Sequence, residues 1–283
     1  MAVSMNPSSR PLPYFDVLLS LLDKHPVLEQ TFGRHVHWGY WETPPSKCPT
    51  PHQFAEAAEE LTRLVYQAAK VSDGQRVLDV GCGFGGTIAS LNEQFINMDL
   101  QGLNIELRQL HRAKRLVSPL ASNQVGWVNA NACSLPFADA SFDSVLAVEC
   151  IFHFPNRIDF FREAFRVLKP GGKLALSDFI STPLLRPAAR LIKAWPASIG
   201  FYGECDVQFT FQQYRDLASE TGFSICLERD ITRNTLPTYD FIHDLQRQIQ
   251  FRSLSAIVQT LFIECASRAG VIKYGILGFE KPL

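Results

Sequence analysis

The stretch from Val77 to Gly86 constrains the fold more than any other part of the chain. An apolar run that includes one carboxylate, Asp79, ends in a group of four glycines, and residues 87–95 that follow have a helical pattern. Glycine adopts positive φ without strain and lets a ligand approach the bare backbone. The stretch therefore predicts a strand, a tight ligand-binding turn and a helix.

Within this turn, Gly81, Gly83 and Gly86 have the spacing G-x-G-x-x-G, which is typical of nucleotide-binding turns in Rossmann-like sheets. The carboxylate of Asp79 indicates which ligand the turn binds. It would repel a pyrophosphate, whereas it would attract the cationic amine of a methionine-derived ligand. We therefore predict S-adenosylmethionine (SAM) as the cofactor rather than NAD.

The rest of the chain alternates strand-like and helix-like segments, which predicts one α/β sheet flanked by helices. We expect strands over residues 100–105, 125–129, 144–150, 174–177, 223–228 and 274–279. We expect helices over residues 14–22, 54–69, 106–116, 157–168 and 211–221, and a mostly helical stretch over 239–269.

Two segments outside the regular alternation are predicted to cover the ligand. Residues 1–53 form an N-terminal helical lid before a cofactor-binding domain of residues 54–283. Their aromatic cluster at 35–41 is either part of that lid or plain packing. Residues 181–209 carry four aromatic side chains and follow the carboxyl end of a strand, where α/β sheets bind ligands, so we interpret them as a substrate cap.

The composition limits which kinds of partner and which cellular compartment we expect for the protein. The net charge of -1 provides no basic field for nucleic acid. Seven cysteines without a C-x-x-C pair, no signal-peptide pattern and no apolar run of membrane-spanning length predict a cytoplasmic protein. His35 and His37 have no third ligand at suitable spacing, so we expect packing or pocket lining and no metal site.

Polar side chains follow the predicted second and third strands. Asn104 stands where nucleotide-binding sheets usually carry an acid for the ribose hydroxyls. Gln109 is either a second ribose contact or a surface residue. Asn131 has an amide that can reach an adenine amino group, and the backbone N–H of Ala132 can meet a ring nitrogen.

Several motifs together resemble those of the SAM-dependent methyltransferases with a Rossmann-like fold. They are Val77–Gly86, Leu135-Pro136-Phe137, Ser141-Phe142-Asp143 and residues 167–172. With the aromatic residues 37–41, the chain is most similar to the branch that methylates quinones, tocopherols, sterols and natural products. The resemblance implies a seven-stranded, mostly parallel sheet with an antiparallel last strand, and a small-molecule methyl acceptor.

The resemblance also implies roles for individual residues. Asp79 and the backbone of Gly81, Gly83 and Gly85 would hold the methionine part of SAM. The other implied cofactor contacts are Asn104, Ile105 and Gln109 at the ribose, Asn131 and Ala132 at the adenine, Glu149 beside the sulfonium and Tyr40 over the methionine.

Three residues are candidates for catalysis. His153 lies just beyond the predicted fourth strand, and an ordinary histidine pKa of about 6.5 suits a general base; the alternative is a hydrogen-bonded helix-start residue. In enzymes that this chain resembles, an acid matching Asp178 assists that histidine, and an acid matching Glu149 faces the cation that develops during C-methylation.

O-methylation with His153 as base is therefore the leading hypothesis. Methylation of carbon or nitrogen on an isoprenoid, indole or aromatic substrate through Glu149 is the alternative. A third hypothesis, from a different functional class, is that the protein is a catalytically silent SAM-binding partner subunit.

Overall fold

The computed structural model describes residues 13–183, 201–203 and 205–283, and within them shows a seven-stranded sheet. The strand order is β3-β2-β1-β4-β5-β7-β6, with β7 antiparallel to both of its neighbours and the other pairs parallel. The strands are β1 (Arg76–Val80), β2 (Asp99–Asn104), β3 (Gln124–Asn129), β4 (Phe142–Val148), β5 (Leu168–Ser181), β6 (Ser224–Asp230) and β7 (Ile272–Glu280). The predicted fold class is confirmed.

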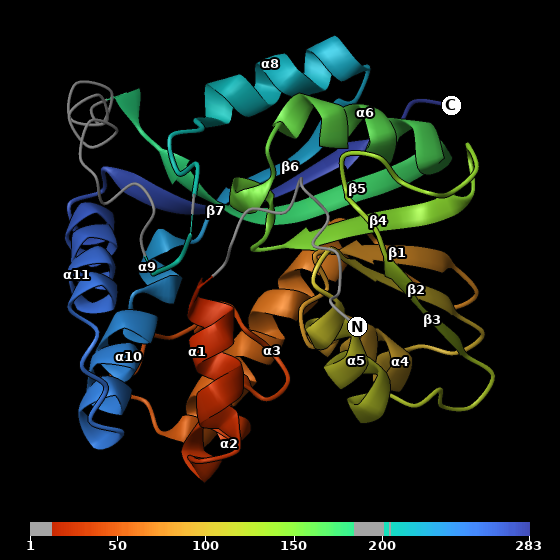
Figure 1. Ribbon diagram of the computed structural model, residues 1–283. Helices are drawn as coiled ribbons and strands as arrows, with labels where there is room; N and C mark the ends of the chain where they lie inside the picture. The colour runs from red at the N-terminus through yellow and green to blue at the C-terminus, as the bar shows by residue number, and fades with distance from the viewer. Residues whose placement is uncertain (1–12, 184–200, 204) are drawn as a thin grey trace, which may run out of the picture.

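Helices cover both faces of this sheet (Figure 1). One face carries α6 (Arg157–Val167) and α8 (Phe211–Thr221), and the other carries α3 (Pro51–Ala68), α4 (Gly86–Gln94) and α5 (Leu107–Leu116). The remaining elements are α1 (Pro13–Leu22), α2 (Pro26–Phe32), α9 (Thr232–Thr235), α10 (Pro237–Gln248), α11 (Leu254–Arg268) and the 3-10 turn η1 (Ile151–His153). No described helix combines the length and apolarity needed to cross a bilayer.

Because both faces are covered, the central strands are apolar on both sides, as parallel sheets require. Consecutive residues of β1 illustrate this: Val77 packs in the core cluster on one side, with residues of α3 and α4, and Leu78 packs on the other side, with residues of α6 and α8. Both side chains are fully buried. The sheet is thereby fixed in register, since a shift by one residue would exchange its two faces.

A third hydrophobic cluster lies below the sheet, where α1, α2 and α10 meet α3 (Figure 1). Phe54 of α3 stacks on Phe241 of α10 with ring centroids 4.3 Å apart, and Phe32 of α2 contacts Phe54 at 5.1 Å. The N-terminal segment therefore shares its core with a C-terminal helix. Pro26 at the first position of α2 supplies the helix-compatible φ.

Strand β5 differs from its prediction. It begins at Leu168, before the expected breaker Lys169-Pro170-Gly171-Gly172, and continues to Ser181. The pairing with β4 shifts between Phe142 and Ser144, so the breaker is accommodated as an irregularity inside a continuous strand. Of the predicted cap, residues 184–200 and 204 lie outside the described residues.

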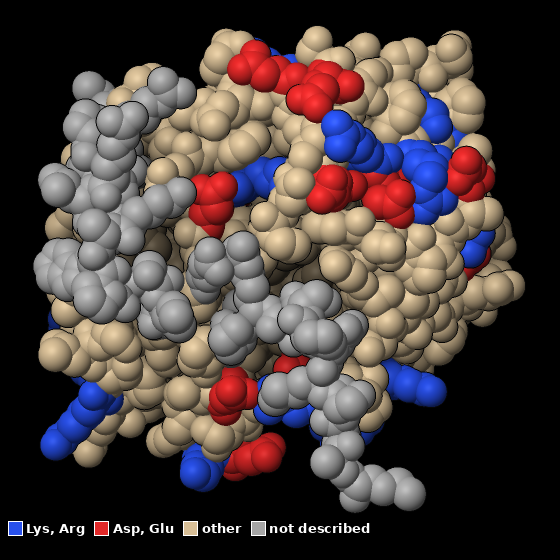
Figure 2. Space-filling view, turned by 45° about the horizontal axis from the view of Figure 1, so that its top comes forward, with Lys and Arg blue, Asp and Glu red and all other residues tan. Residues whose placement is uncertain are grey.

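The face shown in Figure 2 carries acidic and basic side chains next to one another. Ion pairs also join side chains on and beside α6, among them Arg162–Glu220 at 3.1 Å and Arg166–Asp139 at 2.7 Å. Interspersed charges of this kind create no extended field of one sign.

Candidate functional site

A cavity opens at the carboxyl ends of β1, β2 and β4, where α/β sheets bind their ligands. Its walls come from the glycine turn after β1, from the ends of β2 and β3, and from residues that follow β4. The predicted site residues among them are Asp79, Gly81, Gly83, Asn104, Ile105, Gln109, Asn131, Ala132, Glu149 and His153. The fold thus brings together most of the residues that the sequence analysis singled out.

The glycine turn is built from left-handed backbone. The φ angles of Gly81, Gly83 and Gly85 are 67°, 53° and 84°. A Cβ atom on Gly83 would meet only Gln109 Oε1, at 4.0 Å, so this glycine leaves room at the cavity wall. At Gly85 the same atom would lie 2.7 Å from the ring of Trp127, and Gly85 is absent from the cavity wall. Gly85 therefore permits packing beneath the turn.

Asp79 places a buried carboxyl group in the wall of this cavity. Its side chain is hydrogen-bonded by Thr87, while its Oδ2 is buried and has no partner among the described residues. Burial raises the pKa of Asp79 to about 8. A buried carboxylate oxygen without a partner is costly. A cationic amine in the cavity would supply the missing partner, so the site fits SAM.

The amides at the ends of β2 and β3 also lie in the wall. Asn104 Nδ2 donates to Gln109 Oε1 at 3.0 Å, and Asn104 Oδ1 accepts from the Glu106 N–H at 3.0 Å. Gln109 is buried, so it is no surface residue. Asn131 Oδ1 accepts from the Cys133 N–H at 2.9 Å, which fixes this amide beside Ala132.

A second, largely apolar cavity adjoins the first, and the two share Tyr14, Val36, His37, Glu149 and His153. Most of its other described walls are aliphatic and aromatic side chains, and α1, α2, α10 and the strand end of β5 supply several of them. Examples are Leu18, Leu28, Phe32, Phe179, Leu245 and Phe251. Such a chamber suits an apolar ligand that meets polar groups at the shared end.

Glu149 stands at that shared end in a strained conformation, with φ 49°. Its Oε2 accepts from the Trp38 N–H at 3.0 Å and from the Tyr274 hydroxyl. Burial raises the pKa of Glu149 to about 8, although both hydrogen bonds act against this shift. Its carboxyl group is therefore mostly protonated at neutral pH.

His153 ends η1 and faces both cavities. Its Nδ1 lies 3.6 Å from Cys205 Sγ, and its ring stacks on Tyr14 with centroids 6.0 Å apart and planes inclined by 20°. A histidine in this position can reach a group held at the junction of the two cavities.

Besides Gly85, the structure separates two predicted residues, Asp178 and Tyr40, from the cavities. Asp178 lines neither cavity: its Oδ2 accepts from Arg157 at 3.0 Å and from Tyr214 at 2.5 Å, and its Oδ1 accepts from the Phe179 N–H at 2.8 Å. The expected direct support of His153 by Asp178 therefore has no basis in this geometry.

Tyr40 is the second of these residues, since it is buried and also lines neither cavity. Its hydroxyl accepts from Arg229 Nη2 at 3.0 Å, and the Arg229 guanidinium lies 5.6 Å from its ring centroid. In place of Tyr40, the N-terminal segment contributes Tyr14 and Arg34, which the sequence analysis missed, because nothing in their local pattern marks them as ligand-facing.

His35 and His37 line the cavity, as one of the two readings expected. His37 Nε2 lies 3.2 Å from His35 Nδ1 and 3.0 Å from Thr62 Oγ1, and His35 Nε2 lies 2.8 Å from Glu59 Oε2. Burial lowers the pKa of both histidines, that of His37 to about 3. In the described part of the chain, no three His, Cys, Asp or Glu side chains are grouped to hold a metal ion.

Fold and cavity together define a Rossmann-like α/β protein with a cavity at the turn after β1, where sheets of this kind bind nucleotide cofactors. A family model described as a methyltransferase domain matches residues 78–176. Methyltransferase GfsG of Streptomyces halstedii is 33% identical over 213 residues, covering 75% of this chain and 74% of the relative. The 27-O-demethylrifamycin SV methyltransferase of Amycolatopsis mediterranei is 35% identical over 218 residues, 75% of each chain.

A solved structure shares the fold. Geranyl diphosphate C-methyltransferase from Streptomyces coelicolor A3(2), in complex with Mg²⁺, geranyl diphosphate and S-adenosyl-L-homocysteine, superposes with a TM-score of 0.71 at 15% identity, covering 96% of this chain and 100% of that one. The chain belongs to the SAM-dependent methyltransferases that act on small molecules. The predicted enzyme class and cofactor are confirmed.

Proposed function

We propose that the protein methylates a hydroxyl oxygen of a small, mostly apolar, secondary-metabolite-like acceptor, with His153 as the general base. SAM supplies a methyl group already activated by its sulfonium. One observation carries the proposal: His153 lies where the cofactor cavity meets the apolar cavity. The relative named for 27-O-demethylrifamycin SV supports oxygen as the acceptor atom.

The cofactor would be held by residues of the first cavity. Asp79 would bind the amine through its unpartnered Oδ2, with the backbone of Gly81 and Gly83 alongside. Asn104, Ile105 and Gln109 would contact the ribose, Asn131 and Ala132 the adenine, and Glu149 would lie beside the sulfonium.

In the second cavity, the chain aligns the acceptor and excludes water. Its apolar walls favour the carbon skeleton of the acceptor and direct a hydroxyl to the polar shared end. His153 would accept the proton of that hydroxyl as the oxygen bonds to the methyl carbon and the bond from that carbon to sulfur breaks, which leaves S-adenosylhomocysteine. The protonated imidazole then returns its proton to solvent.

The variant His153→Ala tests the base. We expect turnover to fall by at least about a hundredfold, the usual contribution of a general base. The affinity for S-adenosylhomocysteine should remain within about twofold, because other residues supply the cofactor contacts. His52→Ala is the matched control, since His52 is exposed on α3 and lines neither cavity.

The assay incubates methyl-labelled SAM with a panel of neutral polyketide and terpenoid alcohols and measures methylated products by mass spectrometry. Turnover by His153→Ala at the wild-type level would remove His153 from the mechanism.

A second candidate is methylation of carbon or nitrogen. It is favoured by the carboxyl group of Glu149 at the shared end and by the aromatic rings of Phe152 and Phe179, whose centroids are 5.7 Å apart in the second cavity. Such walls stabilise a developing cation. In that case Glu149→Gln would abolish turnover and His153→Ala would leave it intact. A catalytically silent subunit would yield no methylated product with any acceptor in the panel.

A further inference from the structure

Arg157 occupies an unfavourable place for a cation. It is the first residue of α6, where the positive end of the helix dipole repels a guanidinium, and its side chain is only 4% exposed. Asn156, just before it, caps the helix by accepting from the Ile158 N–H at 3.1 Å. The helix therefore does not need Arg157 in order to start, and the partners of Arg157 must explain its position.

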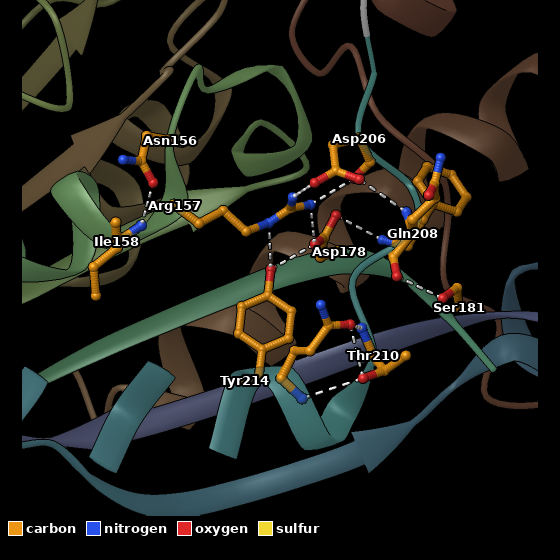
Figure 3. A network of polar contacts seen from close by, with 11 residues as sticks. Asn156, Arg157, Ile158, Asp178, Ser181, Asp206, Gln208, Thr210 and Tyr214 are labelled. Atoms are coloured by element: carbon orange, nitrogen blue, oxygen red, sulfur yellow. Dashed lines mark hydrogen bonds and ion pairs between the residues drawn. The ribbon is translucent and has the colours of Figure 1, made fainter. Parts of the chain in front are cut away.

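Those partners come from three separate elements (Figure 3). Arg157 Nη2 donates to Asp178 Oδ2 at 3.0 Å, at the end of β5, and Nε donates to the Tyr214 hydroxyl of α8 at 3.3 Å. Arg157 also donates twice to Asp206: Nη1 to the carboxylate at 2.7 Å and Nη2 to the backbone carbonyl at 2.7 Å. The guanidinium lies 4.6 Å from the ring centroid of Phe209.

Arg157 contacts the segment 205–209 at Asp206 and Phe209. This segment forms part of the apolar cavity. Cys205 and Val207 line that cavity, and Cys205 Sγ lies 3.6 Å from His153 Nδ1. The Asp206 N–H donates to the Phe152 carbonyl at 2.9 Å, next to His153. None of residues 205–209 lines the cofactor cavity.

We propose that Arg157 is a positioning residue that locks the segment 205–209, through Asp206, as the wall of the acceptor cavity beside His153. The proposal rests on the proposed function in that it takes the apolar cavity as the acceptor site. It also assigns Asp178 a role: this buried carboxylate holds the guanidinium in place from behind. Asp178 thus acts on the site through Arg157 and the Asp206 segment.

Asp206 is the residue to change. Removing Arg157 would leave Asp178 buried without its cation, which destabilises folds strongly. The Asp206 side chain is 45% exposed, and its removal keeps the Arg157–Asp178 pair. Glu220→Ala is a matched control, because it also removes one carboxylate from an arginine of α6, at the exposed Arg162–Glu220 pair.

The experiment measures the full-length protein in three ways. Alkylation of Cys205 by N-ethylmaleimide, followed by peptide mass mapping, reports on the segment. The affinity for N-phenyl-1-naphthylamine, a neutral apolar fluorophore, probes the acceptor cavity. Calorimetric titration with S-adenosylhomocysteine probes the cofactor cavity.

In Asp206→Ala we expect Cys205 to react at least about tenfold faster and the fluorophore to bind at least about tenfold more weakly, the usual effect of losing a charge-assisted hydrogen bond. The affinity for S-adenosylhomocysteine should stay within about twofold. Asp206→Asn, which keeps an oxygen for the Gln208 N–H, should give values between those of the wild type and Asp206→Ala. Glu220→Ala should match the wild type.

Unchanged Cys205 reactivity or unchanged fluorophore affinity in Asp206→Ala would overturn the proposal. A parallel loss of S-adenosylhomocysteine affinity would also overturn it, because the role would then be general stability. None of these measurements needs methyl transfer, so failure of the general-base mechanism would show separately, in the His153→Ala assay.

Discussion

At the scale of single residues, the pKa of a carboxyl group is shifted in opposite directions in two parts of this molecule. Burial raises the pKa of Asp79 and of Glu149 to about 8. Glu59 is also partly buried, but hydrogen bonds from His35 and Ser90 outweigh that burial and hold its pKa at about 2. The difference is the supply of partners, since Asp79 Oδ2 has none among the described residues.

A pH dependence of cofactor affinity follows for Asp79. Below pH 8 its carboxyl group is mostly protonated and must release that proton to bind an amine. Affinity for S-adenosylhomocysteine should therefore rise by up to about tenfold per pH unit from pH 6 toward pH 8 and then level off. Titration calorimetry in buffers of different ionisation enthalpy measures both the affinity and the released proton.

Two variants distinguish the effect of the Asp79 carboxyl group on binding from that of Glu149. Asp79→Asn should bind weakly with no dependence on pH over this range. At pH 9, where the Glu149 carboxyl group is ionised, Glu149→Gln should weaken SAM more than S-adenosylhomocysteine, because only SAM carries the sulfonium beside which Glu149 is proposed to lie. An affinity for S-adenosylhomocysteine that falls between pH 6 and pH 8 would contradict the role of Asp79.

At the scale of elements, two glycines in the turn between β1 and α4 have different structural roles. We expect Gly83→Ala to fold with a stability loss of about 1 to 2 kcal/mol, the cost of left-handed backbone for alanine, and to lose at least about tenfold in cofactor affinity. The added methyl group would have free space in the apo protein but would occupy the cavity wall.

Gly85→Ala should mainly lower the stability of the fold rather than the affinity for the cofactor. It carries the same backbone cost, and its methyl group would also press on Trp127, which adds about 1 to 3 kcal/mol. Gly74→Ala is the control, because its φ is 79° and a Cβ there would meet nothing within 4 Å. Urea unfolding and S-adenosylhomocysteine titration of the three variants check the order. Equal stability of Gly85→Ala and Gly74→Ala would contradict the packing role of Gly85.

Elements with strong local signals were predictable from the sequence. Helix α8 has the predicted bounds, because Thr210 and Gln213 form a capping box and Gly222 ends the helix in left-handed backbone. The early start of β5 was not predictable, because it depends on distant segments: Leu168 pairs with Phe142 of β4, and the backbone of Gly171 and Gly172 bonds to Lys281 after β7.

For the molecule as a whole, the residues that line the first cavity were easier to predict from the sequence than those that line the second. The residues of the cofactor cavity follow successive strand ends, and parallel strands bring their carboxyl ends to one edge. The acceptor cavity depends on contacts between distant segments, such as Tyr14 with His153 and Arg157 with Asp206. No local pattern encodes these pairings, so the predictions placed Asp178 and Tyr40 at a site whose cavities neither residue lines.

Global stability should have a maximum in mildly acidic solution. Burial lowers the pKa of His35 and His37, so unfolding takes up protons below about pH 6.5, and stability falls with acid. The low pKa of Glu59 adds to this loss below about pH 4.5. Asp79 and Glu149 act in the opposite sense, because the folded protein keeps protons that the unfolded chain releases above about pH 4.5.

Between about pH 4.5 and 6.5 the two histidines and the two carboxyl groups oppose each other, and stability should change little. Between pH 6.5 and 8 only the carboxyl groups act, so the free energy of unfolding should fall by about 2 to 4 kcal/mol. Urea unfolding at pH 5.5, 6.5 and 8 measures this fall, and Asp79→Asn should remove about half of it. Stability that rises from pH 6.5 to 8 would show that these buried carboxyl groups are ionised in the folded protein, and the proton release expected on cofactor binding would then be absent as well.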